Sequence, residues 1–136
     1  MEVGERNLEE LLRRMDPALA PGEFVFTADR LPDGVDPLCR FREPEGVTCI
    51  LDRADAERVG IEFTYPCRMI TLRIHSSLEA VGFLALIAAE LARLGISVNV
   101  VSAFYHDHLF VPSGRAEDAM AALRALAAAR PPCTST

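Results

Sequence analysis

Apolar residues in the second half of the chain recur first with the period of a strand and then with that of a helix. Apolar and polar residues alternate over residues 69–74, which predicts a strand with one buried face. Residues 78–94 are apolar nearly all round, and Ser76 with Glu79 forms a capping-box pattern that predicts the start of a helix there. Gly95 is predicted to end this helix as its C′ residue. Such a helix has to bury two faces, so we expect it to contact a sheet and also a second layer or subunit.

The same half continues with a hairpin and a final helix. The pattern predicts a strand at residues 98–104, a turn at residues 105–108 and a second strand at residues 109–112. Ser113 or Gly114 opens an Ala-rich helix, and the Pro-Pro pair at 131–132 ends it. Strand, helix, strand, strand, helix is a βαββαβ ferredoxin-like unit without its last strand, so that strand has to come from elsewhere.

The first half supplies a strand to spare. Its pattern predicts a helix that Asn7 caps, with Glu10 as the capping-box partner. A buried strand, a hairpin, a short helix from Asp52 to Gly60 and a further strand that Pro66 ends are predicted next; the strands fall at residues 24–28, 39–43, 47–52 and 61–65. We therefore predict an α+β chain of two ferredoxin-like units, with antiparallel sheets, helices on one face and an edge strand that the units exchange or share.

The predicted organisation has three parts. Residues 1–66 form an N-terminal unit, residues 67–130 form a C-terminal unit, and residues 131–136 form a frayed tail. The acidic N-terminus has no apolar signal core, and this predicts a cytoplasmic protein. The longest uncharged apolar run, at residues 80–89, is ten residues long and too short to cross a bilayer, so no membrane partner is expected.

Composition removes several classes of function. Half of the 136 residues are apolar and the formal net charge is −6, which fits a globular protein and disfavours a nucleic-acid partner. All fourteen basic residues are arginines, and they are scattered along the chain. The absence of lysine excludes Schiff-base chemistry and a P-loop lysine. The four cysteines show no C-x-x-C spacing and are expected to be reduced thiols; they are Cys39, Cys49, Cys67 and Cys133.

Three segments of the second half together resemble an ACT domain. The segment RMITLRIHSSLEAVG at residues 68–82 resembles the opening strand, loop and helix of that domain, and residues 94–102 and 105–112 resemble its following hairpin. The whole chain resembles a small bacterial family built from two ACT-like units. The resemblance implies a regulatory module that senses a free amino acid or a related metabolite at a unit–unit or subunit interface. It implies no catalytic activity and no cofactor. The apolar circumference of residues 78–94 separately predicts a homodimer, or else a tight interface between the two halves that covers the same helix.

The helix start provides one wall of the expected ligand site. The first N–H groups of a helix have no intrahelical partner, so the predicted helix start at Ser76 and Ser77 would accept a ligand carboxylate. The alternative is that Ser76 and Glu79 only satisfy those donors as a capping box. Gly82 costs stability inside a helix and would allow close approach by a ligand or a strand.

The hairpin provides the other wall. Asp107 would accept the ammonium group of an amino acid, although it is also an ordinary turn residue whose side chain bonds its own backbone. Tyr105 and Val81 would line a side-chain pocket. The candidate ligand-binding residues are Ser76, Ser77, Glu79, Val81, Gly82, Asn99, Tyr105, His106 and Asp107.

Three alternatives remain open on the sequence. The first is a pure dimerisation or assembly module without a ligand, in which the apolar helix is the interface. The second is a metal site formed by His75, His106 and His108, which requires a convergence that the sequence does not show. The third is a hydrolase with Ser76 or Ser77 as nucleophile, but the chain has no G-x-S-x-G elbow. The prediction is a non-enzymatic sensor, with no metal and no catalytic residue.

Overall fold

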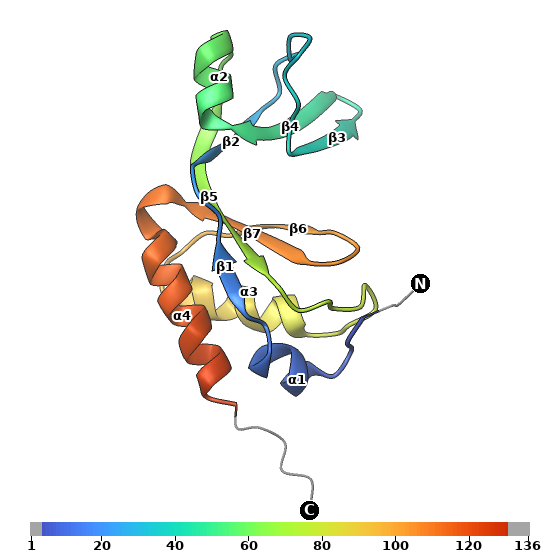
Figure 1. The fold of residues 1–136 in the computed structure, drawn as a ribbon, viewed down its shortest axis with the longest axis vertical. Coiled ribbons are helices and arrows are strands. Elements are labelled where there is room, and N and C mark those ends of the chain that lie inside the picture. Colours follow the sequence, from blue (N-terminus) through green and yellow to red (C-terminus); the bar gives the residue numbers. More distant parts are fainter. Residues whose placement is uncertain (1–3, 131–136) are drawn as a thin grey trace, which may run out of the picture.

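The structure, a computed structural model, describes residues 4–130, and the predicted tail at residues 131–136, with Cys133, lies outside the described residues. Within the described part, seven strands form one antiparallel sheet (Figure 1). The strand order is β3-β4-β2-β5-β7-β6, and β1 also pairs with β5. The strands are β1 (Pro17–Leu19), β2 (Phe24–Thr27), β3 (Cys39–Glu43), β4 (Gly46–Asp52), β5 (Thr64–Leu72), β6 (Asn99–Ser102) and β7 (Asp107–Pro112).

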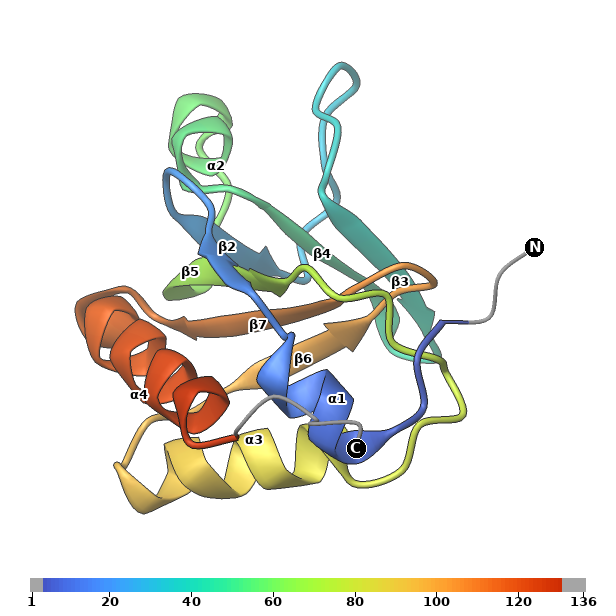
Figure 2. The ribbon, with the colours of Figure 1, turned by 60° about the horizontal axis from the view of Figure 1, so that its bottom comes forward.

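Four α-helices and one 3-10 turn complete the described residues. They are α1 (Leu8–Arg13), α2 (Arg53–Val59), α3 (Phe83–Arg93), the turn at Ser113–Arg115 and α4 (Ala116–Ala128). The fold class is α+β, as predicted, and the helices lie outside the curled sheet (Figures 1 and 2). No helix within residues 4–130 is long and apolar enough to span a bilayer.

The C-terminal unit takes its last strand from the other end of the chain. β5, α3, β6, β7 and α4 supply all but one element of a βαββαβ unit, and β1 pairs with β5 in the remaining position. The register places Pro17 opposite Leu72 and Leu19 opposite Ile70. This confirms that the missing strand comes from elsewhere. The sequence pattern did not predict β1 itself, because three residues are too few to show a period.

The N-terminal unit contains β2, β3, β4, α2 and β5. β5 is therefore shared: its first half pairs with β2, and its second half lies between β1 and β7. The shared strand is central in the sheet rather than an edge strand, which corrects that detail of the prediction. The predicted unit boundary between residues 66 and 67 falls inside β5.

A bulge explains why Pro66 does not end the strand. The register between β2 and β5 shifts between Phe24 and Phe26, and Tyr65 has a φ of 59° at this point. Proline is tolerated at bulges because the ladder already lacks a hydrogen bond there. The two strands predicted at residues 61–65 and 69–74 are thus one bent strand, β5.

Because β5 is bent, the sheet faces of the two units that no helix covers pack against each other. Phe24, Phe26 and Tyr65 from the first half surround Phe110 of β7. Phe110 meets Phe24 and Phe26 edge to face, with ring centroids 6.1 and 5.9 Å apart. The main core lies on the outer face, between the sheet of the C-terminal unit and helices α1, α3 and α4.

Helix α3 begins later than predicted. It starts at Phe83 with Gly82 as its N-cap at a φ of 89°, so residues 78–82 are a loop and Ser76 with Glu79 is not its capping box. The Ser77 hydroxyl oxygen instead accepts a hydrogen bond from the Glu79 backbone N–H at 3.1 Å, which holds a turn. The predicted end is confirmed: Gly95 follows α3 with a φ of 72°, as a C′ glycine does.

Helix α3 buries two sides, as its composition requires. Phe83, Ile87 and Leu91 are fully buried, while Leu84 and Leu86 are partly buried against the same core. Helix α1, from the first half of the chain, lies beside α3 and α4 (Figure 2). The second covering layer is thus supplied within the chain, which is one of the two arrangements that the sequence allowed.

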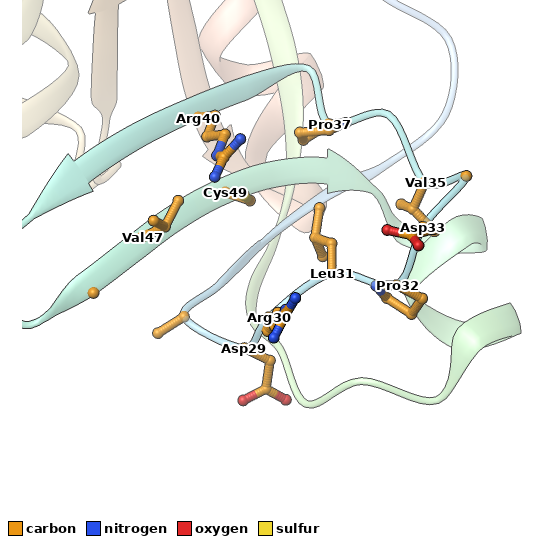
Figure 3. Close-up of a pocket in the computed structure, with 13 residues that line it drawn as sticks. Asp29, Arg30, Leu31, Pro32, Asp33, Val35, Pro37, Arg40, Val47 and Cys49 are labelled. Carbon is orange, nitrogen blue, oxygen red and sulfur yellow. The ribbon is translucent and has the colours of Figure 1, made fainter.

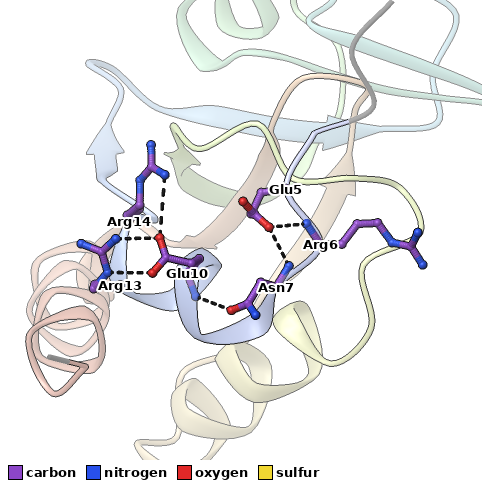
Figure 4. Close-up of polar contacts among 6 residues, drawn as sticks. All are labelled: Glu5, Arg6, Asn7, Glu10, Arg13 and Arg14. Atoms are coloured by element: carbon purple, nitrogen blue, oxygen red, sulfur yellow. Dashed lines mark hydrogen bonds and ion pairs between the residues drawn. The ribbon is translucent and has the colours of Figure 1, made fainter. Parts of the chain in front are cut away.

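Helix α1 is held at its start by two side chains. The Asn7 Oδ1 accepts a hydrogen bond from the Glu10 backbone N–H at 3.0 Å, as predicted (Figure 4). Glu5, rather than Glu10, accepts from the Asn7 backbone N–H, at 2.9 Å. The Glu10 carboxylate instead pairs with Arg13 and Arg14, which corrects its predicted role in a capping box.

Candidate functional site

A cavity of about 140 Å³ lies between the N-terminus of α3 and the start of β7. It contains four of the nine predicted ligand-binding residues, Ser76, Ser77, Gly82 and Asp107. The other lining residues come from the loop before α3, the first turn of α3 and the end of β6; they are Leu78, Ala80, Phe83, Leu84, Ala85 and Ser102.

Asp107 is the charged group of this cavity. Its side chain is only 5% exposed, and its Oδ2 accepts a hydrogen bond of 2.9 Å from the Ser76 hydroxyl. Among residues 4–130, no other side chain donates a hydrogen bond to this carboxylate. A buried carboxylate needs a compensating partner, and one neutral hydroxyl compensates it only in part. The carboxylate therefore favours a cation placed in the cavity.

The N-terminal segment holds the two serines in place. The Glu5 N–H donates to the His75 carbonyl at 2.7 Å, and the Ser77 N–H donates to the Glu5 carbonyl at 2.8 Å. Gly4 makes this pairing possible, because a Cβ at that position would lie 2.6 Å from the His75 oxygen. The loop at the cavity is thus fixed by backbone pairing with a distant segment of the chain.

The first turn of α3 presents backbone donors to the cavity. Gly82 has no side chain, and α3 has no side-chain cap hydrogen bond. The first N–H groups of a helix lack intrahelical acceptors, and the helix dipole adds positive potential there. The N-terminal wall therefore suits a carboxylate. It is formed by Phe83, Leu84 and Ala85, seven residues after the predicted position at Ser76.

Five of the predicted residues lie outside the cavity. Val81 is 84% exposed and Tyr105 is 64% exposed, so neither lines a side-chain pocket in the single chain. Glu79 is exposed, and its carboxylate lies 3.9 Å from Arg6. Asn99, on β6, pairs with Phe110 of β7, and its side chain faces the opposite side of the sheet from Asp107. The His106 Nδ1 lies 3.3 Å from the Ile74 carbonyl oxygen.

Ser102 is the polar residue among the six lining residues that the sequence did not predict. It pairs with Asp107 across the β6–β7 hairpin, so the two side chains leave the sheet on the same face. The hairpin pattern could have predicted Ser102, because a turn at residues 103–106 places residues 102 and 107 opposite each other. The donors of α3 could not be found in this way, because the predicted helix began too early.

The three histidines are separately engaged. The His75 ring packs 5.5 Å from the rings of Phe104 and Tyr105, centroid to centroid. The His108 Nδ1 lies 2.9 Å from the Thr71 hydroxyl oxygen. Burial, and secondarily the neighbouring His106, lowers the pKa of His108. No group of three His, Cys, Asp or Glu residues within residues 4–130 is placed to hold a metal ion.

The described cysteines are free thiols. Cys39, Cys49 and Cys67 form no disulfide and lie in strands, as predicted. Burial raises the pKa of the Cys67 thiol to about 12. Its Sγ donates a hydrogen bond to the Phe24 carbonyl at 3.3 Å, so it is a packing residue between the units rather than a nucleophile.

Comparison with known proteins identifies the family. Two ACT-domain family models match consecutive parts of the chain, over residues 3–68 and residues 64–125. A comparison with curated proteins finds no match. A crystal structure of a protein of unknown function from Vibrio cholerae, described as a possible transport protein, is 41% identical and has a TM-score of 0.79. That match covers 88% of this chain and 95% of the other.

Two more distant structures share the fold. A protein from Agrobacterium tumefaciens is 17% identical, with a TM-score of 0.62 over 77% of this chain and 81% of its own. The aspartokinase alpha and beta subunits are 12% identical, with a TM-score of 0.59 over 81% of this chain and 95% of theirs. The chain belongs to the ACT domain family. ACT domains are commonly regulatory modules that bind small molecules.

Proposed function

We propose that this protein is a non-enzymatic sensor that binds a small free amino acid in the cavity between α3 and β7. The observation that carries the proposal is the opposed chemistry of the two walls. Backbone donors of α3 stand on one side, and the buried Asp107 carboxylate stands on the other. An α-amino acid carries a carboxylate and an ammonium group and matches both walls at once.

The charges orient the ligand. Its carboxylate accepts hydrogen bonds from the first N–H groups of α3, where the helix dipole favours an anion. Its ammonium group donates to Asp107, whose single hydrogen bond from Ser76 leaves further acceptor sites on the carboxylate. Because the ligand ammonium group neutralises the buried Asp107 carboxylate, this ion pair contributes part of the binding affinity.

The size of the cavity restricts the ligand. At about 140 Å³ it is smaller than the pockets of roughly 300–1,000 Å³ that hold drug-sized molecules. Leu78, Ala80 and Leu84 give it apolar walls. We therefore expect glycine, alanine or serine to fit. An amino acid with a large or charged side chain should bind only if that side chain points out of the cavity.

Calorimetry with matched ligands tests the two walls separately. L-alanine is compared with N-acetyl-L-alanine, which lacks the ammonium group, and with L-alaninamide, which lacks the carboxylate. We expect L-alanine to bind and both analogues to bind at least about tenfold more weakly, because each loses a charge-assisted hydrogen bond. Equal binding of all three ligands would contradict the proposed orientation.

A charge-neutral variant tests Asp107. Asp107→Asn keeps the acceptor for Ser76 but removes the charge, so we expect an affinity about 10- to 150-fold weaker for L-alanine. Asp36→Asn is the matched control, because Asp36 is exposed and lies outside the cavity. Equal losses in both variants would show that general charge, and not the Asp107 contact, governs binding.

We propose second that the cavity end of the molecule is an interface with a second copy of the chain. Leu78, Val81 and Tyr105 are at least 64% exposed, and they belong to the loops that surround the cavity. A homodimer through this surface would cover these side chains and close the site at a subunit interface. If no amino acid binds, this assembly role without a ligand is the alternative function.

Sedimentation equilibrium tests the dimer directly. We expect the native chain to be dimeric, and Val81→Asp to shift it toward the monomer, because a charge would be buried in the interface. Val100→Asp is the matched control, since Val100 is an exposed apolar residue on β6. A monomeric native chain, or equal dissociation in both variants, would contradict the proposed surface. The cytoplasmic location stays a prediction.

A further inference from the structure

A second and larger cavity lies in the N-terminal unit, far along the chain from the Asp107 cavity. It has a volume of about 670 Å³ and lies between the loop at residues 28–38 and strands β3 and β4 (Figure 3). This volume is within the range of roughly 300–1,000 Å³ that is usual for small-molecule sites. None of its lining residues is shared with the Asp107 cavity.

The cavity exists because the N-terminal unit lacks a helix. A βαββαβ unit has a helix between its first and second strands, and here the loop at residues 28–38 stands in its place. Pro32 and Pro37 interrupt a helix by removing backbone donors, and Gly34 has a φ of 89°. Helix α2 packs on β4 through Ala56 and Leu51, and the part of the β3–β4 face that α2 leaves open is covered by the irregular loop.

The loop is nevertheless anchored at both ends. The Thr27 Oγ1 donates to the Glu62 carbonyl at 2.7 Å and accepts from the Asp29 N–H at 3.0 Å. The Leu38 N–H donates to the Ile50 carbonyl at 2.8 Å. Leu31 and Val35 pack against the small core of this unit. The apolar side of the cavity is thus a built surface, completed by Val47 of β4.

Two arginines form the charged part of the cavity. Arg30 comes from the loop and Arg40 from β3, so they approach from different walls (Figure 3). Neither guanidinium has a hydrogen-bond or ion-pair partner in the part of the chain that the structure describes. Arg53 and Arg93, by contrast, pair with glutamates at 2.8 and 2.6 Å. Unpaired guanidinium groups in an acidic protein leave a local site for an anion.

The acidic residues of the cavity do not neutralise these arginines. The Asp29 Oδ2 accepts a hydrogen bond from the Glu62 N–H at 3.0 Å, and its side chain points away from the cavity (Figure 3). Asp33 lies beside Val35, farther along the same loop as Arg30 (Figure 3). Its carboxylate repels an anion from that side, so the arginine side is where a negative group is favoured.

We propose that this cavity binds a small organic anion, with its carboxylate or phosphate group between Arg30 and Arg40. Its apolar part contacts Leu31, Val35 and Val47. The guanidinium groups each present several N–H donors in a planar fork that matches an anionic oxygen pair. The proposal concerns a second site and stands independently of the amino-acid cavity.

NMR titration with matched probes tests the ligand class. Isocaproate carries a carboxylate and a branched apolar tail, isocaproamide is its uncharged isostere, and inorganic phosphate is an anion without a tail. At fixed ionic strength we expect saturable shifts of the Gly34 and Gly46 amides, which line the cavity, and none at Gly60, which does not. The expected order of affinity is isocaproate, then phosphate, then isocaproamide.

Two variants and a matched control test the arginines. Arg40→Gln and Arg30→Gln should each weaken isocaproate binding about twofold to fivefold, the upper part of the range for an exposed charge pair. Arg42→Gln is the control, because Arg42 lies two residues along the same strand without lining the cavity. We expect it to change the affinity by less than about twofold, since an exposed charge that does not contact the ligand acts only through Coulomb attraction weakened by salt.

Each outcome decides the proposal. Loss of affinity in Arg30→Gln and Arg40→Gln but not in Arg42→Gln supports it. Equal losses in all three variants overturn it in favour of general attraction to positive charge. Equal affinity for isocaproate and isocaproamide, or shifts that do not saturate, also overturn it. Tighter binding of phosphate than of isocaproate would retain the anion site and remove the apolar contact from the proposal.

Discussion

The two units share a strand order, but the connection between their first and second strands differs. In the C-terminal unit, α3 links β5 to β6, whereas the loop at residues 28–38 links β2 to β3 in the N-terminal unit. Strand pairing therefore does not require the helix. The helix instead decides what covers the outer face of the sheet: α3 leaves a small cavity at its N-terminus, and the loop leaves a large one with two arginines.

The same difference appears in the cores. The core of the C-terminal unit has fifteen buried residues, among them Ile87, Leu91 and Leu123, and this number includes Leu11 and Leu12 of α1 from the first half of the chain. The outer core of the N-terminal unit has three fully buried members, Val25, Leu51 and Ala56. Because the hydrophobic effect scales with the apolar area buried, most of the stability should reside in the C-terminal unit.

The largest expected effect tests this division of stability. Leu91→Ala removes a fully buried side chain of α3 and should cost about 2–5 kcal/mol of unfolding free energy. Leu31→Ala truncates a half-buried side chain of the loop and should cost about 1 kcal/mol. Chemical denaturation measures both values. Equal costs would show that the loop contributes as much to stability as the helix that it replaces.

The next effect concerns α1, the element that the first half contributes to the C-terminal core. Asn7→Ala removes the side-chain acceptor of the Glu10 N–H and should destabilise the protein by about 0.5–2 kcal/mol. Asn99→Ala is the matched control on an exposed strand position and should stay within about 0.5 kcal/mol. An unfolding curve for Asn7→Ala identical to that of the unmutated protein would mean that α1 is held by packing alone.

A smaller effect is expected at the joint between the units. The Tyr65 hydroxyl lies 2.9 Å from the Ser97 Oγ and 3.2 Å from the Phe110 carbonyl oxygen. Tyr65→Phe keeps the ring but loses these bonds, so we expect a cost of about 0.5–1.5 kcal/mol in urea denaturation. Tyr105→Phe, at an exposed position, should change the stability little. Similar stability costs for the two variants would show that the Tyr65 hydroxyl does not stabilise the contact between the units.

The smallest effect is a pH dependence from the inner face of the sheet. Burial lowers the pKa of His108 in the folded chain below its ordinary value of 6.5. The unfolded chain therefore takes up the proton first as the pH falls below 6.5, and stability decreases toward acid. His108→Gln should flatten the stability profile below that pH. An unchanged slope in thermal unfolding would assign the acid sensitivity to other groups.

Local signals predicted several elements correctly. The cap at Asn7, the hairpin turn before Gly46 and the glycine at position 95 each involve residues close together in the sequence. Their geometry follows from backbone and side-chain preferences within a few residues, so the pattern was sufficient. Asp107 and Ser76 were also predicted together, because the strand, loop and hairpin that carry them have a recognisable order.

Other features depended on distant contacts. The Ser76–Glu79 pattern resembles a capping box, but the Ser77 N–H donates to the Glu5 carbonyl. The chain then makes a turn after Ser77, and α3 begins only at Phe83. The residues around Ser76 carry no local signal of this backbone hydrogen bond, because its acceptor, Glu5, lies more than seventy residues away in the sequence. Pro66 was read as a strand end for the same reason, because the bulge that accommodates it is set by pairing with β2.

The sequence alone determined the α+β class, the need for a borrowed strand and the two-sided burial of α3, because these follow from apolar periodicity and from the count of elements. Tertiary structure decided which segment is borrowed, that β5 is shared and central, and where α3 begins. It also brought Arg30 and Arg40 to one cavity. These features depend on β pairing and side-chain packing between residues far apart in the chain, and the periodicity of one segment carries no information about its distant partner.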